Sequence, residues 1–323
     1  MAMHGHDPAL AAAENYRAFA QEARHRSPVY EALASSVAAD AAVLGFLDTL
    51  PPEKRQPNLL FAAARYLLGD PLSMSRLRTL ISQDRGALEA TMLTRRTQTN
   101  EPARCATLLP ALAQLPSPLA LIEVGASAGL TLLIDRYSYD YAGHLITGRD
   151  RLAPTLRCAP RGPVPLPARL PEITWRAGLD LNPLDVTDPA DLAWLEALVW
   201  PEHAHRLARL RAAAALAAAE PPLLVRGDLV DDLPALAAQA PADATLVVFH
   251  TSVLYQVPAP RREAFAQVVR GLPGHWIASE APDVLAYGTL PAPPDGASRN
   301  VLALDGTPLA WTRPHGQEIS WFG

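Results

Sequence analysis

The chain has 323 residues, of which 49% are hydrophobic and 19% are charged, and its formal net charge is −5. This length and composition predict a folded globular protein and exclude a largely disordered chain. The acidic balance argues against a nucleic-acid partner, because a surface that binds phosphates carries an excess of Lys and Arg.

The cysteine content and the length of the apolar runs exclude further classes of protein. Two cysteines, Cys105 and Cys158, are too few for a disulfide scaffold and lack metal-ligand spacing, so we expect no metal site. The first residues show no basic segment followed by an apolar stretch, and no apolar run approaches the ~20 residues of a membrane span. We therefore expect a cytoplasmic protein without a membrane partner.

The first third of the chain is predicted to be helical throughout. Apolar residues recur at helical spacing within residues 43–50 and 60–68, and Ser27-Pro28 has the form of a helix start. No strand pattern occurs before residue 119. We predict a helical N-terminal cap domain over residues 1–115 and an α/β domain over 116–323.

From residue 119 onward, predicted strands alternate with predicted helices. The strands are 119–124, 173–177, 222–226, 244–249 and 275–279, followed by a hairpin of 300–304 and 309–313. The helices are 128–136, 188–219 with a break at Pro201, 232–239 and 260–270. Alternation predicts a parallel sheet covered on both faces, and residues 137–171 are predicted to be an insertion. The fold class is α/β, with a seven-stranded, mostly parallel Rossmann-like sheet.

A glycine-flanked turn follows the first strand. Gly125 and Gly129 carry no side chain, so a ligand can approach the backbone around Ala126 and Ser127. A helix that begins here would point its free N–H groups into the same gap. The turn therefore predicts a site for a nucleotide-like ligand.

Acidic residues end three successive strands. Glu123 ends the first, Asp180 the second and Asp228 the third, and a carboxylate accepts hydrogen bonds through two oxygens. Each one alone is better explained as a helix cap. Together with the glycine turn, they favour a cofactor site at the carboxyl ends of the strands. If the second strand is misplaced, Asp150 takes the place of Asp180.

The letters Gly125-Ala-Ser-Ala-Gly129 also fit the nucleophile elbow of a hydrolase. Ser127 would then be the nucleophile, with Asp228 or Asp283 as the acid and His275 or His315 as the base. Only helices are predicted upstream, whereas a hydrolase elbow follows several strands. Glu123 would also oppose an oxyanion, so this interpretation is disfavoured.

Two further groups of polar residues are candidates for the site. The string that contains Gln98, Asn100, Glu101 and Arg104 is explained either as a capped loop or as side chains that hold a substrate over the sheet edge. His250 follows the fourth strand, as a general base or as a hydrogen-bonded residue at a strand end. Tyr255 lies in the same loop.

The order of elements resembles the class I methyltransferase fold, which binds S-adenosylmethionine, over about two-thirds of the chain. The resemblance implies that Glu123 holds the amino group or orders the loop, Asp180 binds the ribose and Asp228 faces the adenine. It also implies that His250, Glu101 or Tyr255 removes or orients a proton. Ser127 departs from the glycine usual in that loop.

A second resemblance rests on five motifs and extends nearly end to end. The motifs are Gln98-Thr-Asn-Glu101, Glu123-Val-Gly-Ala-Ser-Ala-Gly129, Gly178-Leu-Asp-Leu-Asn-Pro183, Trp200-Pro201 and Pro314-His-Gly316. They look like the bacterial domain-of-unknown-function family 2332, which supplies no known reaction. Membership implies that Asp180, Asn182, His315 and the polar string belong to the family signature.

These observations predict an S-adenosylmethionine-dependent methyltransferase that acts on an unknown small molecule. Substrate contacts are expected from Gln98, Asn100, Arg104 and His315. The first alternative is a non-catalytic ligand-binding or regulatory protein with the same fold, and the serine hydrolase is the second. The oligomeric state stays open.

Overall fold

The computed structural model describes residues 10–322, and the chain divides into two compact units. The helical unit contains the described residues up to Thr99 together with Thr187–Ala208. The sheet unit contains Asn100–Val186 and the chain from Arg209 onward. The observed boundary therefore lies before the predicted one at residue 115, and part of the predicted α/β domain joins the helices.

The helical unit forms as the apolar spacing predicts. Ser27 Oγ accepts the N–H of Tyr30 at 3.1 Å and caps α2, with Pro28 at its first position. Its helices are α1 (Ala12–Ala23), α2 (Pro28–Val37), α3 (Ala41–Leu47), α4 (Pro57–Leu68), α5 (Met74–Gln83), α6 (Arg85–Thr94), α8 (Pro189–Leu198) and the first residues of α9 (Ala204–Ala219), with the short 3₁₀ turn η1 (Pro52–Lys54). No strand precedes residue 119 in the described chain, as predicted.

Specific contacts hold α8 to the helical unit. Arg65 is 7% exposed and donates to the carbonyls of Ala197, at 2.9 Å, and Val199. Trp194 Nε1 donates to the Arg96 carbonyl at 3.0 Å. Trp200 packs its ring 5.6 Å from that of Phe19. Trp200 therefore has a packing role in this unit.

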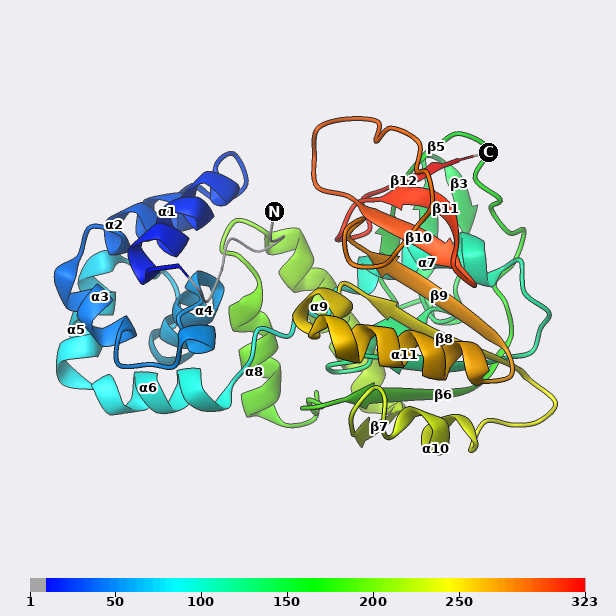
Figure 1. Cartoon of the computed structure of the whole chain (residues 1–323), viewed down its shortest axis with the longest axis horizontal. Coiled ribbons are helices and arrows are strands. Elements are labelled where there is room, and N and C mark those ends of the chain that lie inside the picture. The colour runs from blue at the N-terminus through cyan, green and yellow to red at the C-terminus, as the bar shows by residue number, and fades with distance from the viewer. Residues whose placement is uncertain (1–9, 323) are drawn as a thin grey trace. The chain divides into compact units, whose positions relative to one another are not determined.

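The sheet unit is built on nine strands, where seven were predicted. Their order is β5-β12-β11-β10-β9-β8-β1-β6-β7 (Figure 1). They are β1 (Leu119–Val124), β5 (Ala159–Arg161), β6 (Ile173–Asp180), β7 (Leu223–Arg226), β8 (Thr245–Thr251), β9 (His275–Glu280), β10 (Asn300–Leu304), β11 (Thr307–Thr312) and β12 (Glu318–Trp321). The two additional strands are β12, which continues the predicted hairpin, and β5, which comes from the insertion.

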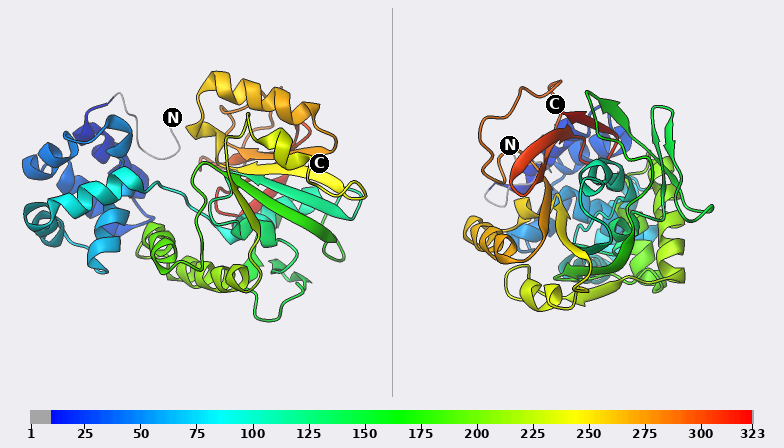
Figure 2. Two further views of the ribbon diagram at one scale, coloured as in Figure 1. Left: turned by 90° about the horizontal axis from the view of Figure 1, so that it is seen from below. Right: turned by 90° about the vertical axis from the view of Figure 1, so that its right-hand side faces the viewer.

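Strand β1 lies at the point where the topology reverses. It pairs in parallel with β6 on one side and with β8 on the other. The chain runs outward from β1 to β6 and β7, then returns to β8 and continues to β9 (Figure 2). In open α/β sheets, ligands bind beyond the carboxyl ends of the strands that flank such a reversal, which are β1 and β8 here.

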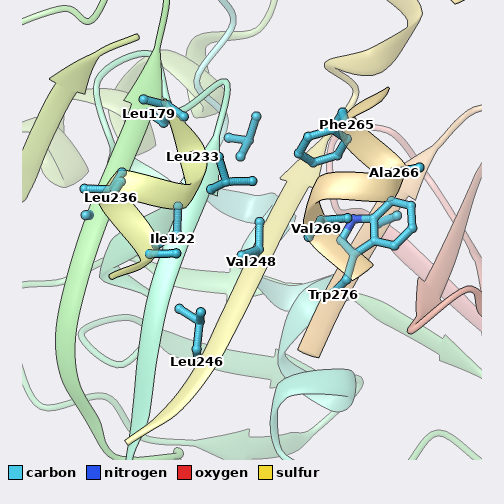
Figure 3. Close-up of a cluster of buried hydrophobic side chains, with 14 of the residues drawn as sticks. Ile122, Leu179, Leu233, Leu236, Leu246, Val248, Phe265, Ala266, Val269 and Trp276 are labelled. Carbon is cyan, nitrogen blue, oxygen red and sulfur yellow. The ribbon is translucent and has the colours of Figure 1, made fainter. Parts of the chain in front are cut away.

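One face of this sheet is covered by α10 (Leu233–Ala237) and α11 (Ala259–Gly271). Ile122 of β1 and Val248 of β8 pack there against Leu236 and Phe265 (Figure 3). Successive side chains of a strand point to opposite faces. Glu123 therefore points to the other face, where α7 (Cys105–Leu112) follows the 3₁₀ turn η2 (Pro102–Arg104).

The predicted helix over 128–136 is wrong. Only the 3₁₀ turn η3 (Leu130–Leu133) forms there. Side chains from later in the chain bind the carbonyls that a helix would use: Tyr137 Oη donates to Leu130 O at 2.7 Å, and Arg176 donates to Leu132 O at 2.9 Å. The chain then enters a small three-stranded sheet of β2 (Ser138–Tyr141), β3 (His144–Ile146) and β4 (Thr155–Arg157).

Among residues 10–322, no single helix has the length and apolar composition to cross a membrane, although α2 and α3 pass that test as a pair bent by 87°.

Candidate functional site

The backbone N–H groups of the turn after β1 donate to acceptors of the protein itself. Ser127 N–H donates to Asp180 Oδ2 at 2.8 Å, and Leu130 N–H donates to Asn100 Oδ1 at 2.8 Å. Gly125 N–H donates to the Leu179 carbonyl at 2.8 Å. These donors therefore do not face a ligand as the sequence predicted.

The space beside the glycines is also filled. A Cβ on Gly125, whose φ is +70°, would lie 2.5 Å from Val253 Cγ2. A Cβ on Gly129, whose φ is +69°, would lie 2.8 Å from Pro222 Cγ. Both glycines are required for the left-handed backbone and for close packing against protein. The predicted open cradle is corrected to a turn that Val253 covers.

Glu123 carries a buried carboxyl oxygen without a hydrogen-bond partner, as does Glu280, which ends β9. Glu123 is 2% exposed; Oε1 accepts the hydroxyl of Thr131, and Oε2 is buried without a hydrogen-bond partner. Burial raises the pKa of Glu123 to about 8, and the nearby Asp180 also raises it, against the lowering effects of Thr131 and Arg104. At neutral pH the carboxyl is mostly protonated, and a cationic ligand would favour its ionised form.

Asp180 borders the turn and serves it as a structural acceptor. Oδ2 accepts from Ser127 N–H, and Oδ1 accepts the N–H of Asn182 at 2.7 Å. The register Glu123↔Gly178 puts Asp180 on the same side of the sheet as Glu123. Asp150 instead lies in the insertion, 3.7 Å from Arg136. Of the two acids considered for the ribose, Asp180 is the one beside the turn.

Asp228 holds the turn that precedes α10 through its own carboxylate, and it does not cap that helix. Oδ1 accepts the N–H of Val230 at 2.7 Å and pairs with Arg261. Burial acts to raise the pKa of Asp228, but the backbone donors of Val230 and Asp231 and the guanidinium of Arg261 outweigh it, so the pKa lies below its ordinary value. Its carboxylate is engaged in holding its own turn.

The polar string does reach the carboxyl edge of the sheet. Asn100 Nδ2 donates to the Ala126 carbonyl at 3.1 Å, so this side chain holds the glycine turn through both of its polar atoms. Arg104 donates to the carbonyls of Thr251 and Pro314, each at 3.0 Å. These contacts explain two members of the string as supports of the edge.

The other members of the string have different surroundings. Glu101 accepts the N–H of Ala103 at 3.1 Å and the Nε of Arg209 at 2.7 Å, and it is 3% exposed. Gln98 belongs to the helical unit, whereas Asn100, Glu101 and Arg104 belong to the sheet unit.

The Pro314-His-Gly316 motif forms a turn against η2. A Cβ on Gly316, whose φ is +80°, would lie 1.9 Å from the Ala103 carbonyl oxygen. Only glycine fits at this approach. The turn brings His315, which is half-buried, next to the Pro314 carbonyl that Arg104 binds.

His250 points to the opposite face from Glu123. The register Glu123↔Phe249 directs His250 toward α11, where it is 0% exposed. Trp276 Nε1 donates to His250 Nε2 at 3.0 Å, which requires a proton on Nδ1, and Nδ1 lies 2.7 Å from Glu280 Oε1. Both ring nitrogens are engaged, as in the hydrogen-bonded alternative to a general base. Tyr255 is half-buried in the 3₁₀ turn η4 (Leu254–Gln256).

Sequence reasoning missed Glu280, the buried acid that ends β9. Its Oε1 also accepts the N–H groups of Val253, at 2.8 Å, and Leu254, at 3.1 Å, so it fixes the turn that covers Gly125. Applying the strand-end argument to β9 would have found it.

The hydrolase interpretation loses its geometric basis. Ser127 is 3% exposed, and the turn follows the first strand of the described chain. A nucleophile elbow instead presents an accessible hydroxyl after several strands. No group of three or more His, Cys, Asp or Glu residues that could hold a metal ion occurs within residues 10–322.

The fold defines an α/β protein with a mostly parallel sheet, a reversal of topology at β1 and a helical N-terminal unit. The chain belongs to the family described as "Uncharacterized protein conserved in bacteria (DUF2332)", which matches residues 13–321. Comparisons with curated proteins and with solved structures gave no match.

Proposed function

We propose that the carboxyl edge of the sheet unit binds a small ligand that carries an ammonium group, with Glu123 as its anchor. The observation that carries the proposal is Glu123 Oε2, a buried carboxyl oxygen without a partner near the carboxyl end of β1, where the topology of the sheet reverses. Burial disfavours the ionised carboxylate, and an ammonium group that donates to Oε2 would stabilise that ionised form.

Within this class, S-adenosylmethionine is the ligand that we infer, and methyl transfer to a small acceptor is the reaction. The strand order β7-β6-β1-β8-β9 is the order of the parallel strands of class I methyltransferases, which supports this choice. The methionine part of that molecule carries an ammonium group for Glu123, and Asp180 stands where a ribose acceptor is expected. The sulfonium would supply the methyl group.

The residues of the chain would act mainly by positioning. Glu123 would hold the ammonium, and Tyr255 on η4 would orient the acceptor. Val253 would have to leave Gly125 for the ligand to enter. Asp228 and His250 are left out of the binding and proton-transfer roles, because Arg261 engages the first and Glu280 and Trp276 engage the second.

A non-catalytic ligand-binding or regulatory protein is the second candidate. It is favoured by His250, the predicted general base, because Trp276 and Glu280 engage both of its ring nitrogens. Fold by itself does not establish a reaction. The two candidates differ in turnover: both bind the ligand, and only the methyltransferase releases S-adenosylhomocysteine when a suitable acceptor is present.

Calorimetric titration of S-adenosylmethionine and S-adenosylhomocysteine into the full chain tests the proposal. Glu123→Gln should weaken binding by about tenfold or more, because a charge-assisted hydrogen bond is lost. Asp228→Asn, at an acid engaged elsewhere, is the matched control and should bind as the wild type does. Absence of binding to the wild type, or equal affinity in wild type and Glu123→Gln, would overturn the proposal.

The pH dependence of binding is a second readout. Because the pKa of Glu123 is about 8 and the ligand binds the ionised form, affinity should rise by about tenfold per pH unit from pH 6 to 7. Glu123→Gln should remove this dependence.

A further inference from the structure

A hollow lies on the α11 face of the sheet, separate from the carboxyl edge that holds Glu123. Its volume is about 450 Å³, within the range of small-molecule pockets. Trp276 and Ala278 of β9 and Ala303 of β10 line it, together with Ala266 of α11. The register His250↔Ala278 puts it on the face to which His250 points. Small apolar side chains and one indole therefore form the wall.

The segment 283–287 also lines the hollow. Arg262 of α11 donates to the Val284 carbonyl at 3.2 Å, which ties this segment to the helix. The charged residues of the lining are two cations, Arg262 and Arg270, and two acids, Glu263 and Asp283. Equal numbers of both signs give the site no net preference for a charged ligand.

Tyr287 supplies the unused polar group of this lining. Its hydroxyl is buried and has no hydrogen-bond partner, although the residue lines the hollow. Burial and the nearby carboxylate of Glu280 raise the pKa of Tyr287, so the hydroxyl stays a donor. A buried donor without an acceptor costs free energy that a ligand acceptor would recover.

We propose that this hollow binds a neutral, planar aromatic molecule whose carbonyl or ring-nitrogen acceptor takes the hydrogen bond of Tyr287. The apolar alanines and the indole suit an aromatic body, and the balanced charges suit a neutral one. The site is also connected to the carboxyl edge. Trp276 donates to His250, and His250 and the Val253 N–H share Glu280 Oε1. A ligand on Trp276 therefore contacts the chain of side chains that fixes the cover of Gly125.

Fluorescence titration of the full chain with the dye Prodan, a neutral naphthalene with a propionyl carbonyl, tests the proposal. The matched probe is dimethylaminonaphthalene, which lacks the acyl group. We expect saturable binding of Prodan, and Tyr287→Phe should weaken it about fivefold while leaving the affinity for the acyl-free probe unchanged. Tyr287→Phe should fold normally, because the hydroxyl that it removes has no partner.

Ala286→Trp is the blocking variant, since Ala286 is an exposed residue of the lining. It should abolish binding of both probes without lowering the melting temperature. The proposal would be overturned by non-saturable binding, by full binding to Ala286→Trp, or by a Tyr287→Phe effect that is absent or equal for both probes. None of these outcomes depends on whether S-adenosylmethionine binds at Glu123.

Discussion

Replacing Glu280 by alanine should destabilise the sheet unit more than any surface change. This carboxylate is 0% exposed, and its Oε1 lies 2.7 Å from His250 Nδ1 and accepts the N–H groups of Val253 and Leu254. Glu280→Ala leaves all three groups without their acceptor.

The magnitude follows from these three hydrogen bonds. Each unsatisfied buried donor costs about 1–3 kcal/mol, and water that enters the new cavity recovers part of it. We therefore expect Glu280→Ala to lower the unfolding free energy by about 4 kcal/mol. Glu280→Gln keeps one acceptor oxygen and loses the charge, so its cost should be about 2 kcal/mol.

Urea unfolding monitored by tryptophan fluorescence measures the loss, with separate transitions fitted for the two units. Hydrogen exchange of residues 252–256 provides a local readout, because the amides of Val253 and Leu254 should exchange faster. Glu263→Ala, at an exposed glutamate of α11 that forms no ion pair among the described residues, is the control and should stay within about 0.5 kcal/mol of wild type. A similarly small change in Glu280→Ala, with unchanged exchange, would refute the reasoning.

Three further predictions concern the edge around Glu123. Because the folded-state pKa of Glu123 is raised from 4.5 to about 8, the stability it contributes is complete below pH 4.5 and is lost as the pH rises to about 8. The unfolding free energy of wild type relative to Glu123→Gln should therefore fall from pH 5 to 8 in urea titrations, and a constant difference would count against the raised pKa. Asn100→Ala removes two hydrogen bonds to the glycine turn and should cost about 2–3 kcal/mol in the same assay, so a neutral result would exclude its clamping role. Gly316→Ala places a Cβ 1.9 Å from a backbone oxygen and should lower the unfolding free energy by more than about 3 kcal/mol. Gly288→Ala is the control, because a Cβ there meets open space. Equal melting temperatures of the two variants would contradict the close packing at Gly316.

Much of the sheet could be predicted because its strands and turns are specified by patterns of residues that are neighbours in the sequence. The apolar run of residues 119–124 became β1 with the expected bounds, and Asp305-Gly306 forms the hairpin turn with φ of 51° and 82°. The break near Pro201 separates α8 from α9 as expected. These features depend on residues that are neighbours in the chain.

The errors came from contacts between distant residues. Arg176 and Tyr137 bind the carbonyls that the predicted helix over 128–136 would have used, and no local pattern reports them. The pairing of β5 with β12 joins segments more than a hundred residues apart. For the candidate site, the strand ends predicted that Glu123 and Asp180 lie at one edge of the sheet, but they did not reveal that Asp228 turns to Arg261.

The central claim is that Glu123 Oε2 receives an ammonium group of a ligand at the carboxyl ends of β1 and β8. A crystal structure of the chain with S-adenosylhomocysteine tests it most directly. The account predicts the amino group within hydrogen-bond distance of Glu123 Oε2 and Val253 displaced from Gly125. A ligand bound elsewhere, with Val253 still in contact with Gly125, would contradict it.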